Sequence, residues 1–513
     1  MVKILDCTLR DGGYYTNWDF DAQTVDTYFD AFNQLPVEYL EIGYRSPKLK
    51  GYLGEYFYCP EYVLEQVKNQ SNKKLVIILN EKDVRVQDIE PLLRPCVGII
   101  TMVRLAIDPQ NLKRAIGLAE AVKKMGFEVG FNVMYMSTWA EQRGFINELP
   151  LINDITDYFY MVDSFGGVYP EDVRATYDLV RSKTNVKIGF HGHNNMELGL
   201  INTLTAIDCG ADIVDVTITG MGRGAGNLKT ELLLTSLNAK GLLDFDFNPL
   251  SKVVDVFSEL QLQHEWGTNL PYMVSGANSL PQKDVMEWVG KRYYSFNSII
   301  RALDNQSKGI EDNFQLPVYD FSKDKTHETV LIVGGGNSVV HHAKAINQFI
   351  QSHPDLTIIH ASSKNAFCLE HNNRDHFYCL VGNEGHRLED VFQGAYVAGG
   401  QCILPPYPRK MGTYVPSSFK DHCFELDVVD FTPTFIDSHS SLALQTAIKL
   451  GATTAYFVGY DGYIGNAISE KEQELFMENE FLFAQAKLSD LACISLTPTS
   501  YTQLGQESLF AHV

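Results

Sequence analysis

Short apolar runs alternate with amphipathic segments along the first 240 residues. Asn111–Lys124 is one amphipathic segment, because its apolar residues recur at three- and four-residue spacing and therefore lie on one face of a helix. Pro170–Ser182 and Glu197–Asp208 show the same helical spacing. Eight strand-length runs are predicted at Lys3–Thr8, Val37–Gly43, Lys74–Asn80, Gly98–Leu105, Glu128–Tyr135, Tyr158–Asp163, Val186–His191 and Asp212–Ile218. Eight strand–helix units predict a (β/α)8 TIM barrel over residues 1–240, although a doubly wound sheet has the same alternation.

The pattern changes after the eighth unit. Residues 241–310 lose the strand rhythm and are predicted to form a helical extension, with helices at Leu250–Leu262 and Pro281–Gly290. Residues 311–327 are polar and turn-rich, as in a linker. Residues 328–513 begin with a strand and a glycine turn, and further strands are predicted at Leu356–Ala361, Phe377–Val381 and Thr454–Val458. This C-terminal part is predicted to be a separate Rossmann-like α/β domain.

Composition and charge exclude several classes of function. The 513 residues carry 42 Lys and Arg against 63 Asp and Glu, so the formal net charge is −21. This acidity argues against a nucleic-acid or anionic-membrane surface. No apolar run is long enough for a signal peptide or a membrane span. The nine cysteines form no Cys-x-x-Cys pair, which favours reduced thiols and a cytoplasmic location.

Candidate metal ligands follow three of the predicted strands. Arg10 and Asp11 come at the end of the first, His191 and His193 at the end of the seventh, and a glycine-rich loop after the eighth leads to Asn227. In a barrel these strand ends converge on one mouth, and a carboxylate with two imidazoles suits a divalent metal. Each feature alone has a structural explanation: a packed His pair, an ion pair and a tight turn. Their coincidence favours the metal site.

Four motifs together resemble the DRE-TIM metallolyase superfamily, and the fit is best to its 4-hydroxy-2-oxovalerate aldolase branch. They are Leu5-Asp-Cys-Thr-Leu-Arg-Asp-Gly-Gly, Asp163-Ser-Phe-Gly-Gly, Gly189-Phe-His-Gly-His-Asn-Asn and the loop that ends in Gly226-Asn227. The resemblance implies that Asp11, His191 and His193 bind the metal and that Asn227 is a further ligand. It also implies that Arg10 holds an enolate oxygen and that Ser164 contacts the substrate carboxylate. Arg104 matches a family arginine near the end of the fourth strand. Two roles for it are possible: substrate binding and a structural ion pair with Glu41.

The implied activity is that of a metal-dependent (class II) aldolase. It would cleave a 4-hydroxy-2-oxoacid reversibly to pyruvate and an aldehyde, with Mn²⁺ as the first choice of metal and Mg²⁺, Co²⁺ or Zn²⁺ as alternatives. A divalent cation stabilises the enolate of such a reaction as a Lewis acid. No lysine stands in these motifs, which argues against a Schiff-base mechanism. We also expect a homo-oligomer.

One position departs from the aldolase pattern. The family typically has a histidine general base three residues after the metal-binding aspartate, where this chain has Tyr14. With an ordinary pKa of about 10, a tyrosine more readily donates a proton or hydrogen bond than removes a proton. The alternative within the superfamily is a Claisen-type condensation of an acyl-CoA. This chain lacks the Gly-Glu-Gln that usually marks those enzymes.

The C-terminal domain carries a second candidate site. Its glycine turn, Gly334-Gly-Gly-Asn-Ser338, suits an anion but lacks the Gly-x-Gly-x-x-Gly spacing of a dinucleotide site. Two later motifs, which begin at Ser438 and Ala455, weakly resemble the Rossmann-like domain of the family 42 sialyltransferases and DUF115 proteins. That resemblance implies a nucleotide or nucleotide-sugar site at Gly335, Asn337, Ser338, Ser440 and Asp461. The alternative is ordinary turn and cap chemistry.

The C-terminal resemblance would place the aldolase in surface-polysaccharide sugar biosynthesis. It also opens a hypothesis of another class, namely a nucleotide-sugar-binding transferase that uses the barrel as a scaffold. The intact set of Asp11, His191 and His193 argues against that hypothesis, because a scaffold has no need of metal ligands.

Overall fold

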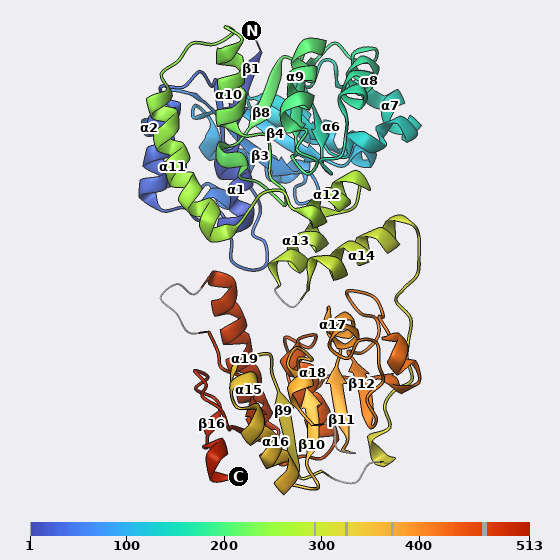
Figure 1. Ribbon diagram of the computed structural model, residues 1–513. Coiled ribbons are helices and arrows are strands. Elements are labelled where there is room, and N and C mark those ends of the chain that lie inside the picture. Colours follow the sequence, from blue (N-terminus) through green and yellow to red (C-terminus); the bar gives the residue numbers. More distant parts are fainter. Residues whose placement is uncertain (1, 292–293, 324–326, 371–373, 464–468) are drawn as a thin grey trace. The chain divides into compact units, whose positions relative to one another are not determined.

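The computed structural model describes residues 2–291, 294–323, 327–370, 374–463 and 469–513. The chain divides into two compact units, Met1–Met286 and Glu287–Val513 (Figure 1). The division falls inside the segment predicted as a helical extension. Residues 324–326 of the predicted linker lie outside the described residues. The predicted fold class, a TIM barrel with a second α/β unit, is confirmed.

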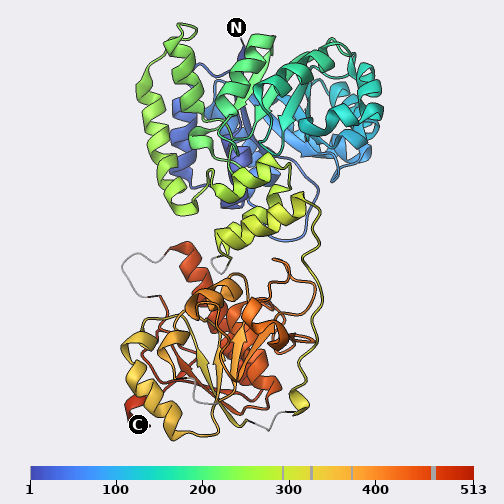
Figure 2. The same cartoon turned by 45° about the vertical axis from the view of Figure 1, so that its right-hand side comes forward.

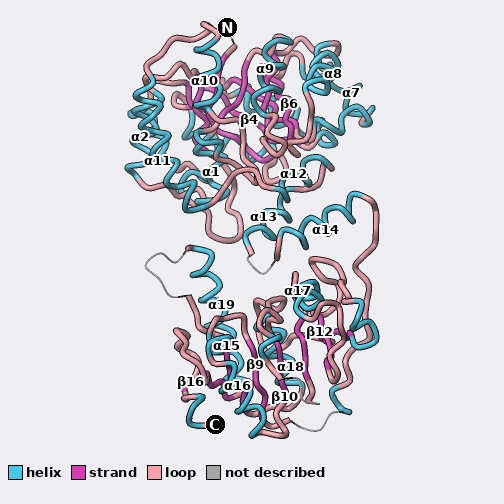
Figure 3. The backbone as a smooth tube through the Cα atoms, in the orientation of Figure 1, coloured by secondary structure: helices cyan, strands magenta, loops and turns pink. Residues whose placement is uncertain are grey.

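The first unit is a closed barrel of eight parallel strands in sequence order. Figure 3 shows these strands enclosed by helices. The strands are β1 Lys3–Asp6, β2 Tyr39–Tyr44, β3 Lys74–Asn80, β4 Ile100–Ile107, β5 Glu128–Val133, β6 Tyr158–Asp163, β7 Lys187–Gly192 and β8 Ile213–Val216. Each lies within two residues of a predicted start, so apolar run length was a sufficient guide to the barrel.

Alternate residues along each barrel strand belong to two different layers of the hydrophobic core. Leu5, Tyr39 and Val76 belong to a small cluster of buried side chains from several barrel strands. Their neighbours Ile4 and Leu40 belong instead to the large cluster that includes the surrounding helices. Successive strand residues point to opposite faces, so one sequence run supplies both layers.

Helices follow the barrel strands as predicted. In the first unit they are α1 Thr8–Thr16, α2 Ala22–Phe32, α3 Glu55–Tyr58, α4 Glu61–Gln70, α5 Val86–Leu93, α6 Leu112–Lys124, α7 Arg143–Glu148, α8 Pro170–Arg181, α9 Gly199–Cys209, α10 Thr230–Ala239, α11 Phe247–His264 and α12 Leu270–Ala277. Helix α13, Gln282–Gly290, spans the division between the units.

The first strand ends earlier than predicted. β1 stops at Asp6 and helix α1 begins at Thr8, so Arg10 and Asp11 lie on a helix rather than at a strand end. The two glycines of the first motif, Gly12 and Gly13, are needed for packing. A Cβ on Gly12 would lie 2.5 Å from Met221 Sδ, and one on Gly13 would lie 2.1 Å from the Trp18 ring. Both contacts are too close for any side chain, so glycine allows α1 to pack against these neighbours.

The second unit contains an eight-stranded sheet whose paired strands all run parallel, in the order β13-β12-β11-β10-β9-β14-β15-β16. The strands are β9 Thr329–Val333, β10 Thr357–His360, β11 His376–Cys379, β12 Gly400–Leu404, β13 Cys423–Glu425, β14 Thr454–Val458, β15 Ala492–Ser495 and β16 Gly505–Gln506. Four of them, β12, β13, β15 and β16, were not predicted.

Helices cover both faces of this sheet (Figure 2). Val330 and Ile332 pack in one core with α18 (His439–Lys449) and α19 (Glu470–Leu488), whereas Leu331 and Val333 pack in another with α16 (Ala343–Ser352). The helices of this unit are α14 Phe296–Ser307, α15 Ser338–His341, α16 Ala343–Ser352, α17 Glu384–Val391, α18 His439–Lys449 and α19 Glu470–Leu488. The described part of the predicted linker lies along the sheet edge, where the Tyr319 N–H donates to the Glu425 carbonyl at 3.0 Å.

All nine cysteines are free thiols. Within the described ranges, no helix combines the length and the apolar character needed to cross a membrane.

Candidate active site

A cavity of about 460 Å³ opens at the carboxyl ends of the barrel strands. Most of the residues predicted from the motifs line it, namely Arg10, Asp11, Tyr14, Ser164, His191 and His193. Asn227 lies beside it through its contact with Asp11, whereas Arg104 lies beneath it. The fold therefore gathers residues from α1, from the end of β7 and from the residues that follow β6 and β7 at one mouth.

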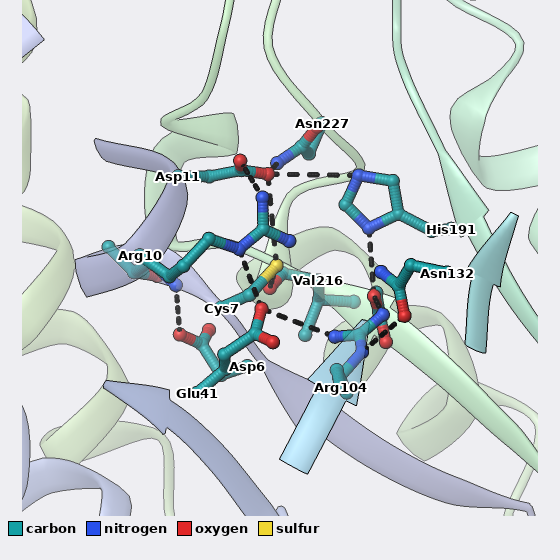
Figure 4. Close-up of polar contacts among 12 residues, drawn as sticks. Asp6, Cys7, Arg10, Asp11, Glu41, Arg104, Asn132, His191, Val216 and Asn227 are labelled. Atoms are coloured by element: carbon teal, nitrogen blue, oxygen red, sulfur yellow. Dashed lines mark hydrogen bonds and ion pairs between the residues drawn. The ribbon is translucent and has the colours of Figure 1, made fainter. Parts of the chain in front are cut away.

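Asp11 is the meeting point of the polar contacts in this mouth (Figure 4). Its carboxylate forms an ion pair with Arg10 and accepts a hydrogen bond of 2.7 Å from Asn227 Nδ2. Its Oδ2 lies 3.7 Å from His191 Nε2, too far for a hydrogen bond. Burial acts to raise the pKa of Asp11, but the charges of Arg10 and His191 outweigh it and lower the pKa. Asp11 is thus an anion facing an imidazole nitrogen.

A second carboxylate orients His191. Nδ1 of His191 lies 2.8 Å from Asp215 Oδ2, and both side chains are buried. A carboxylate at one ring nitrogen fixes the tautomer and directs the other nitrogen, in this case Nε2, toward a metal. Asp215 lies in the middle of β8 and thus performs this role from within the barrel wall.

A buried charge network forms the floor of the mouth. Arg104 donates to Asp215 Oδ2 at 2.5 Å, to Glu41 Oε2 at 3.2 Å and to Asn132 Oδ1 at 2.6 Å. Its guanidinium also stacks 4.0 Å from the Tyr160 ring centroid. The side chain is fully buried and does not line the cavity, and it forms the ion pair with Glu41 that was one of its two predicted roles. Glu41 completes the floor by accepting a 2.6 Å hydrogen bond from Arg10 Nε.

The remaining predicted ligands carry polar atoms that the protein leaves unused. His193 Nδ1 and Asn227 Oδ1 are buried, and neither has a hydrogen-bond partner among the residues that the structure describes. Burial, together with the nearby charge of His191, lowers the pKa of His193 to about 3, so its imidazole is neutral. Neutral imidazole and amide oxygen are both metal-binding groups. The residues present therefore fit a divalent cation.

Cys7 is a further donor in this region that the motifs did not single out. Its thiol lies within reach of Asp11 and His191, in a cluster that could hold a metal ion. Burial raises the pKa of the thiol well above its usual value, and Sγ donates to the Val216 carbonyl at 3.5 Å. Since metals bind the thiolate, the protonated thiol is a weaker metal donor than the neighbouring oxygen and nitrogen atoms.

The outer wall of the cavity is more apolar and more exposed. Tyr14 is 39% exposed, contacts Trp18 edge to face at 5.1 Å, and has the Arg223 guanidinium 5.6 Å from its ring centroid. Ser164 Oγ accepts a 2.9 Å hydrogen bond from the Tyr135 N–H, which leaves the hydroxyl proton free to donate. Both groups can therefore reach a molecule in the cavity.

Several residues of the site were not identified from the sequence. Asp215 and Asn132 belong to strands that were predicted, and a charged or amide residue within an apolar strand is a usable signal. Arg223 lies in the glycine-rich loop, where the pattern drew attention to the glycines rather than to the cation between them. No sequence signal indicated which charges pair across the barrel, because those pairs join distant strands.

The residues predicted for the second unit also come together. Gly335, Asn337, Ser440 and Asp461 line a cavity of about 730 Å³, and Ser338 contacts Asp461 beside it. Glu384, Arg387 and Lys364 line the same cavity and were not predicted.

Comparison with known proteins identifies the family of the barrel. A family model described as HMGL-like matches residues 1–260, half of the chain. The chain belongs to the HMGL-like family. The predicted resemblance to the DRE-TIM enzymes is thereby confirmed. Membership supports a lyase, and aldolases of this family depend on a divalent metal.

Relatives of this HMGL-like chain carry two enzyme names. The 4-hydroxy-2-oxovalerate aldolase of Bacillus thuringiensis is 30% identical over 273 residues, which are 50% of this chain and 75% of the relative. Its counterpart from Chloroflexus aurantiacus is 30% identical over 262 residues, with 50% and 72% covered. The oxaloacetate decarboxylase of Mycobacterium tuberculosis is 27% identical over 249 residues, with 47% and 71% covered.

A crystal structure is similar over the same part of the chain. It is described as the N-terminal domain of a "putative aldolase" from Bacteroides vulgatus and is 58% identical, with a TM-score of 0.56. The match covers 59% of this chain and all of that domain. These similarities concern the HMGL-like half of the chain.

Proposed function

We propose that the HMGL-like barrel is a divalent-metal-dependent aldolase that interconverts a 4-hydroxy-2-oxoacid with pyruvate and an aldehyde. One observation carries the proposal. Asp11 and His191 Nε2 face the same space, beside buried atoms of His193 and Asn227 that have no partner among the described residues. Arg10 stands next to this set and lines the same cavity.

The charge balance of the mouth favours a divalent cation. Asp11, Glu41 and Asp215 contribute three negative charges to the buried network and Arg10 and Arg104 two positive ones, so −3 + 2 leaves −1 before the histidines and Arg223 of the more exposed wall are counted. A divalent cation beside Asp11 would offset this buried negative charge. Asp11, His191, His193 and Asn227 are the residues that would hold the ion. Once bound, it would supply Lewis-acid stabilisation of enolate charge.

The surrounding side chains have complementary tasks. Arg10 keeps a positive charge beside the enolate oxygen, because Glu41 and Asp11 hold its guanidinium in place. Ser164 donates its free proton to the substrate carboxylate. Tyr14 donates a hydrogen bond to the 4-hydroxyl oxygen, the atom that becomes the aldehyde oxygen. In cleavage the hydroxyl proton passes to water in the cavity, the C3–C4 bond breaks to release the aldehyde, and the electron pair of that bond forms the enolate, which takes a proton from water at C3 to give pyruvate.

A second candidate reaction is decarboxylation of oxaloacetate, because one relative carries that name. It would form the same pyruvate enolate after loss of carbon dioxide and would need no group for a 4-hydroxyl. The position of Tyr14 in the cavity wall favours the aldol reaction. Comparing turnover of oxaloacetate with that of 4-hydroxy-2-oxopentanoate distinguishes the two.

Exchange of the pyruvate methyl protons tests the proposal directly. We expect the protein with Mn²⁺ to incorporate solvent deuterium into pyruvate, as followed by NMR, and to stop after treatment with a chelator. Asp11→Asn should lose both bound metal and exchange. Asp208→Asn, an exposed carboxylate on α9, is the matched control and should retain both. Absence of exchange with Mn²⁺, Mg²⁺, Co²⁺ and Zn²⁺ would refute the proposal.

A further inference from the structure

The sheet of the second unit reverses its strand order beside β9. Strands β10 to β13 follow on one side of β9, and β14 to β16 lie on the other. The loops after β9 and β14 therefore diverge and leave a crevice at their carboxyl ends, the usual position of a ligand in an open parallel sheet. The cavity of about 730 Å³ lies there. Its size is within the range of about 300–1,000 Å³ for small-molecule sites.

The glycine turn after β9 is not where an anion binds. Gly334 and Gly336 donate their N–H groups to the carbonyls of Val458 and Gly459. Asp461 Oδ2 accepts the Ser338 N–H at 3.0 Å, and the other Asp461 oxygen accepts the Ser338 hydroxyl. A Cβ on Gly336 would lie 2.6 Å from Asp461 Cγ, so glycine makes room for this carboxylate. The Asp461 carboxylate therefore occupies the position at this turn where a phosphate would otherwise bind.

Positive charge gathers on a different wall of the cavity, at the end of β10. Lys364 is exposed, and within the described ranges its ammonium group contacts the Gly335 carbonyl at 3.3 Å and pairs with no carboxylate. Arg387 Nη1 lies 3.4 Å from Ser362 Oγ and forms an ion pair with Glu384. The hydroxyl of Ser362 lies next to Gly335 as well. Lys364, the ion pair of Arg387 with Glu384 and the Ser362 hydroxyl therefore line one part of the cavity.

The part of the cavity wall formed by α19 and by the residues that follow β14 carries acidic and amide groups. Asp461, Glu472 and Glu478 line it. Ser440 Oγ donates to Asn479 Oδ1 at 2.5 Å, and Asn479 Nδ2 donates to the Tyr501 hydroxyl at 3.0 Å. Carboxylates accept hydrogen bonds from hydroxyl groups, and an amide held in this way can extend the same network. This wall suits a ligand rich in hydroxyls.

We propose that the cavity between β9 and β14 binds a phosphorylated polyhydroxy compound, the chemistry shared by nucleotides and sugar phosphates. Lys364, Arg387 and Ser362 contact the phosphate, and the acidic wall around Asp461 contacts the hydroxyl groups. The cationic part of the lining would bind the phosphate end of such a ligand and the acidic part its hydroxyl end. The glycine turn would contribute no contact.

A neighbouring cavity of the same unit supports the choice of site. It measures about 570 Å³ and is lined largely by apolar groups such as Leu404, Pro406, Met411 and Phe435. Its arginines are engaged by the protein, since Arg409 pairs with Glu425 and Arg301 contacts His386 at 3.0 Å. The unpaired cation Lys364 belongs to the cavity at the strand reversal.

Binding by the full-length protein tests the proposal. Titration calorimetry with cytidine 5′-monophosphate and glucose 1-phosphate should show binding by at least one, and the comparison separates a nucleotide from a sugar phosphate. Lys364→Glu should weaken that binding by about tenfold or more, since a hydrogen bond to a charged group contributes about 1.5–3 kcal/mol. Lys344→Glu on α16 makes the same charge change at an exposed position outside the cavity lining and should leave the affinity unchanged.

Three further probes separate the parts of the ligand. Cytidine and glucose lack the phosphate, and phenyl phosphate lacks the hydroxyls, so each should bind more weakly than the phosphorylated polyhydroxy compound. The proposal is overturned if neither cytidine 5′-monophosphate nor glucose 1-phosphate binds more tightly than inorganic phosphate. Equal weakening by Lys364→Glu and Lys344→Glu, or equal binding of phenyl phosphate, would also overturn it. Urea unfolding of the full-length protein, which both variants should leave unchanged, serves as the folding control.

Discussion

The barrel and the sheet of the second unit both place a cavity at the carboxyl ends of parallel strands, but they hold their charges differently. In the barrel, Arg104 is fully buried between Glu41 and Asp215, and the charges of the floor are paired with one another. In the open sheet, Lys364 is exposed, and the cavity lining includes both cationic and acidic groups. A closed barrel brings strand side chains together inside, where charges must pair. An open sheet relies on loops, which can leave charges for a ligand.

The strongest test of this difference is to remove the central cation of the barrel floor. Arg104→Met would leave the buried carboxylates of Glu41 and Asp215 without their partner, so the free energy of unfolding should fall by about 3–5 kcal/mol. Urea unfolding measures the loss. Lys364→Met in the second unit is the matched change and should alter stability little. An Arg104→Met protein of normal stability with a raised KM for pyruvate would instead assign Arg104 to substrate binding.

Arg10 tests whether a paired cation at the barrel mouth also serves chemistry. Arg10→Ala removes the positive charge beside the enolate oxygen, and loss of one such stabilising group typically costs about 10²–10³-fold in rate. The rate of deuterium exchange into pyruvate measures the effect, with metal content measured in parallel. Exchange at the normal rate with normal metal content would place Arg10 among the structural residues of the floor.

Tyr14 tests the exposed part of the barrel cavity. Tyr14→Phe should lower carbon–carbon bond turnover by about 10²-fold, at the low end of general acid–base effects, and leave metal content and pyruvate exchange unchanged. Cleavage of 4-hydroxy-2-oxopentanoate measures it. Tyr62→Phe removes another exposed hydroxyl, outside the cavity lining, and is the control. Unchanged cleavage in Tyr14→Phe would remove this hydroxyl from the mechanism.

The smallest effect concerns pH. Burial raises the pKa of Asp163 from 3.8 to about 6, although the N–H groups of Gly166 and Gly167 oppose the shift. Its contribution to stability is complete below pH 3.8. As the pH rises from about 4 to 6, the unfolded state ionises first, so this contribution is lost, by at most about 1.4 kcal/mol per pH unit.

Comparison with a variant isolates the contribution of Asp163. The change in unfolding free energy between about pH 4.5 and about pH 6.5 should be more negative for the wild type than for Asp163→Asn. Parallel pH profiles for the two proteins would contradict the raised pKa.

Much of the barrel could be predicted because it depends on local pattern. Apolar runs located the eight strands, and the motif at His191 and His193 located the mouth. The helical position of Asp11 could not be read in this way, since it depends on Trp18 and Met221 packing against two glycines. Arg104 shows the same limit. Its matching position suggested substrate contact, whereas its burial results from partners on three other strands.

The second unit was harder to predict. The glycine turn suggested a phosphate site, but the partner of Ser338 is Asp461, 123 residues away. Lys364 and Arg387 stand in no motif, and only the order of the strands brings them to one cavity. The surface-polysaccharide setting stays a prediction.

The alternating chain of Asp11, Arg10, Glu41, Arg104, Asp215 and His191 has a consequence for redesign. Its members depend on one another, so a change at one calls for compensation at the next. The upper wall around Tyr14 and Arg223 is outside that chain. Substitutions in this upper wall should therefore change the substrate range without disturbing the buried charge network beneath it.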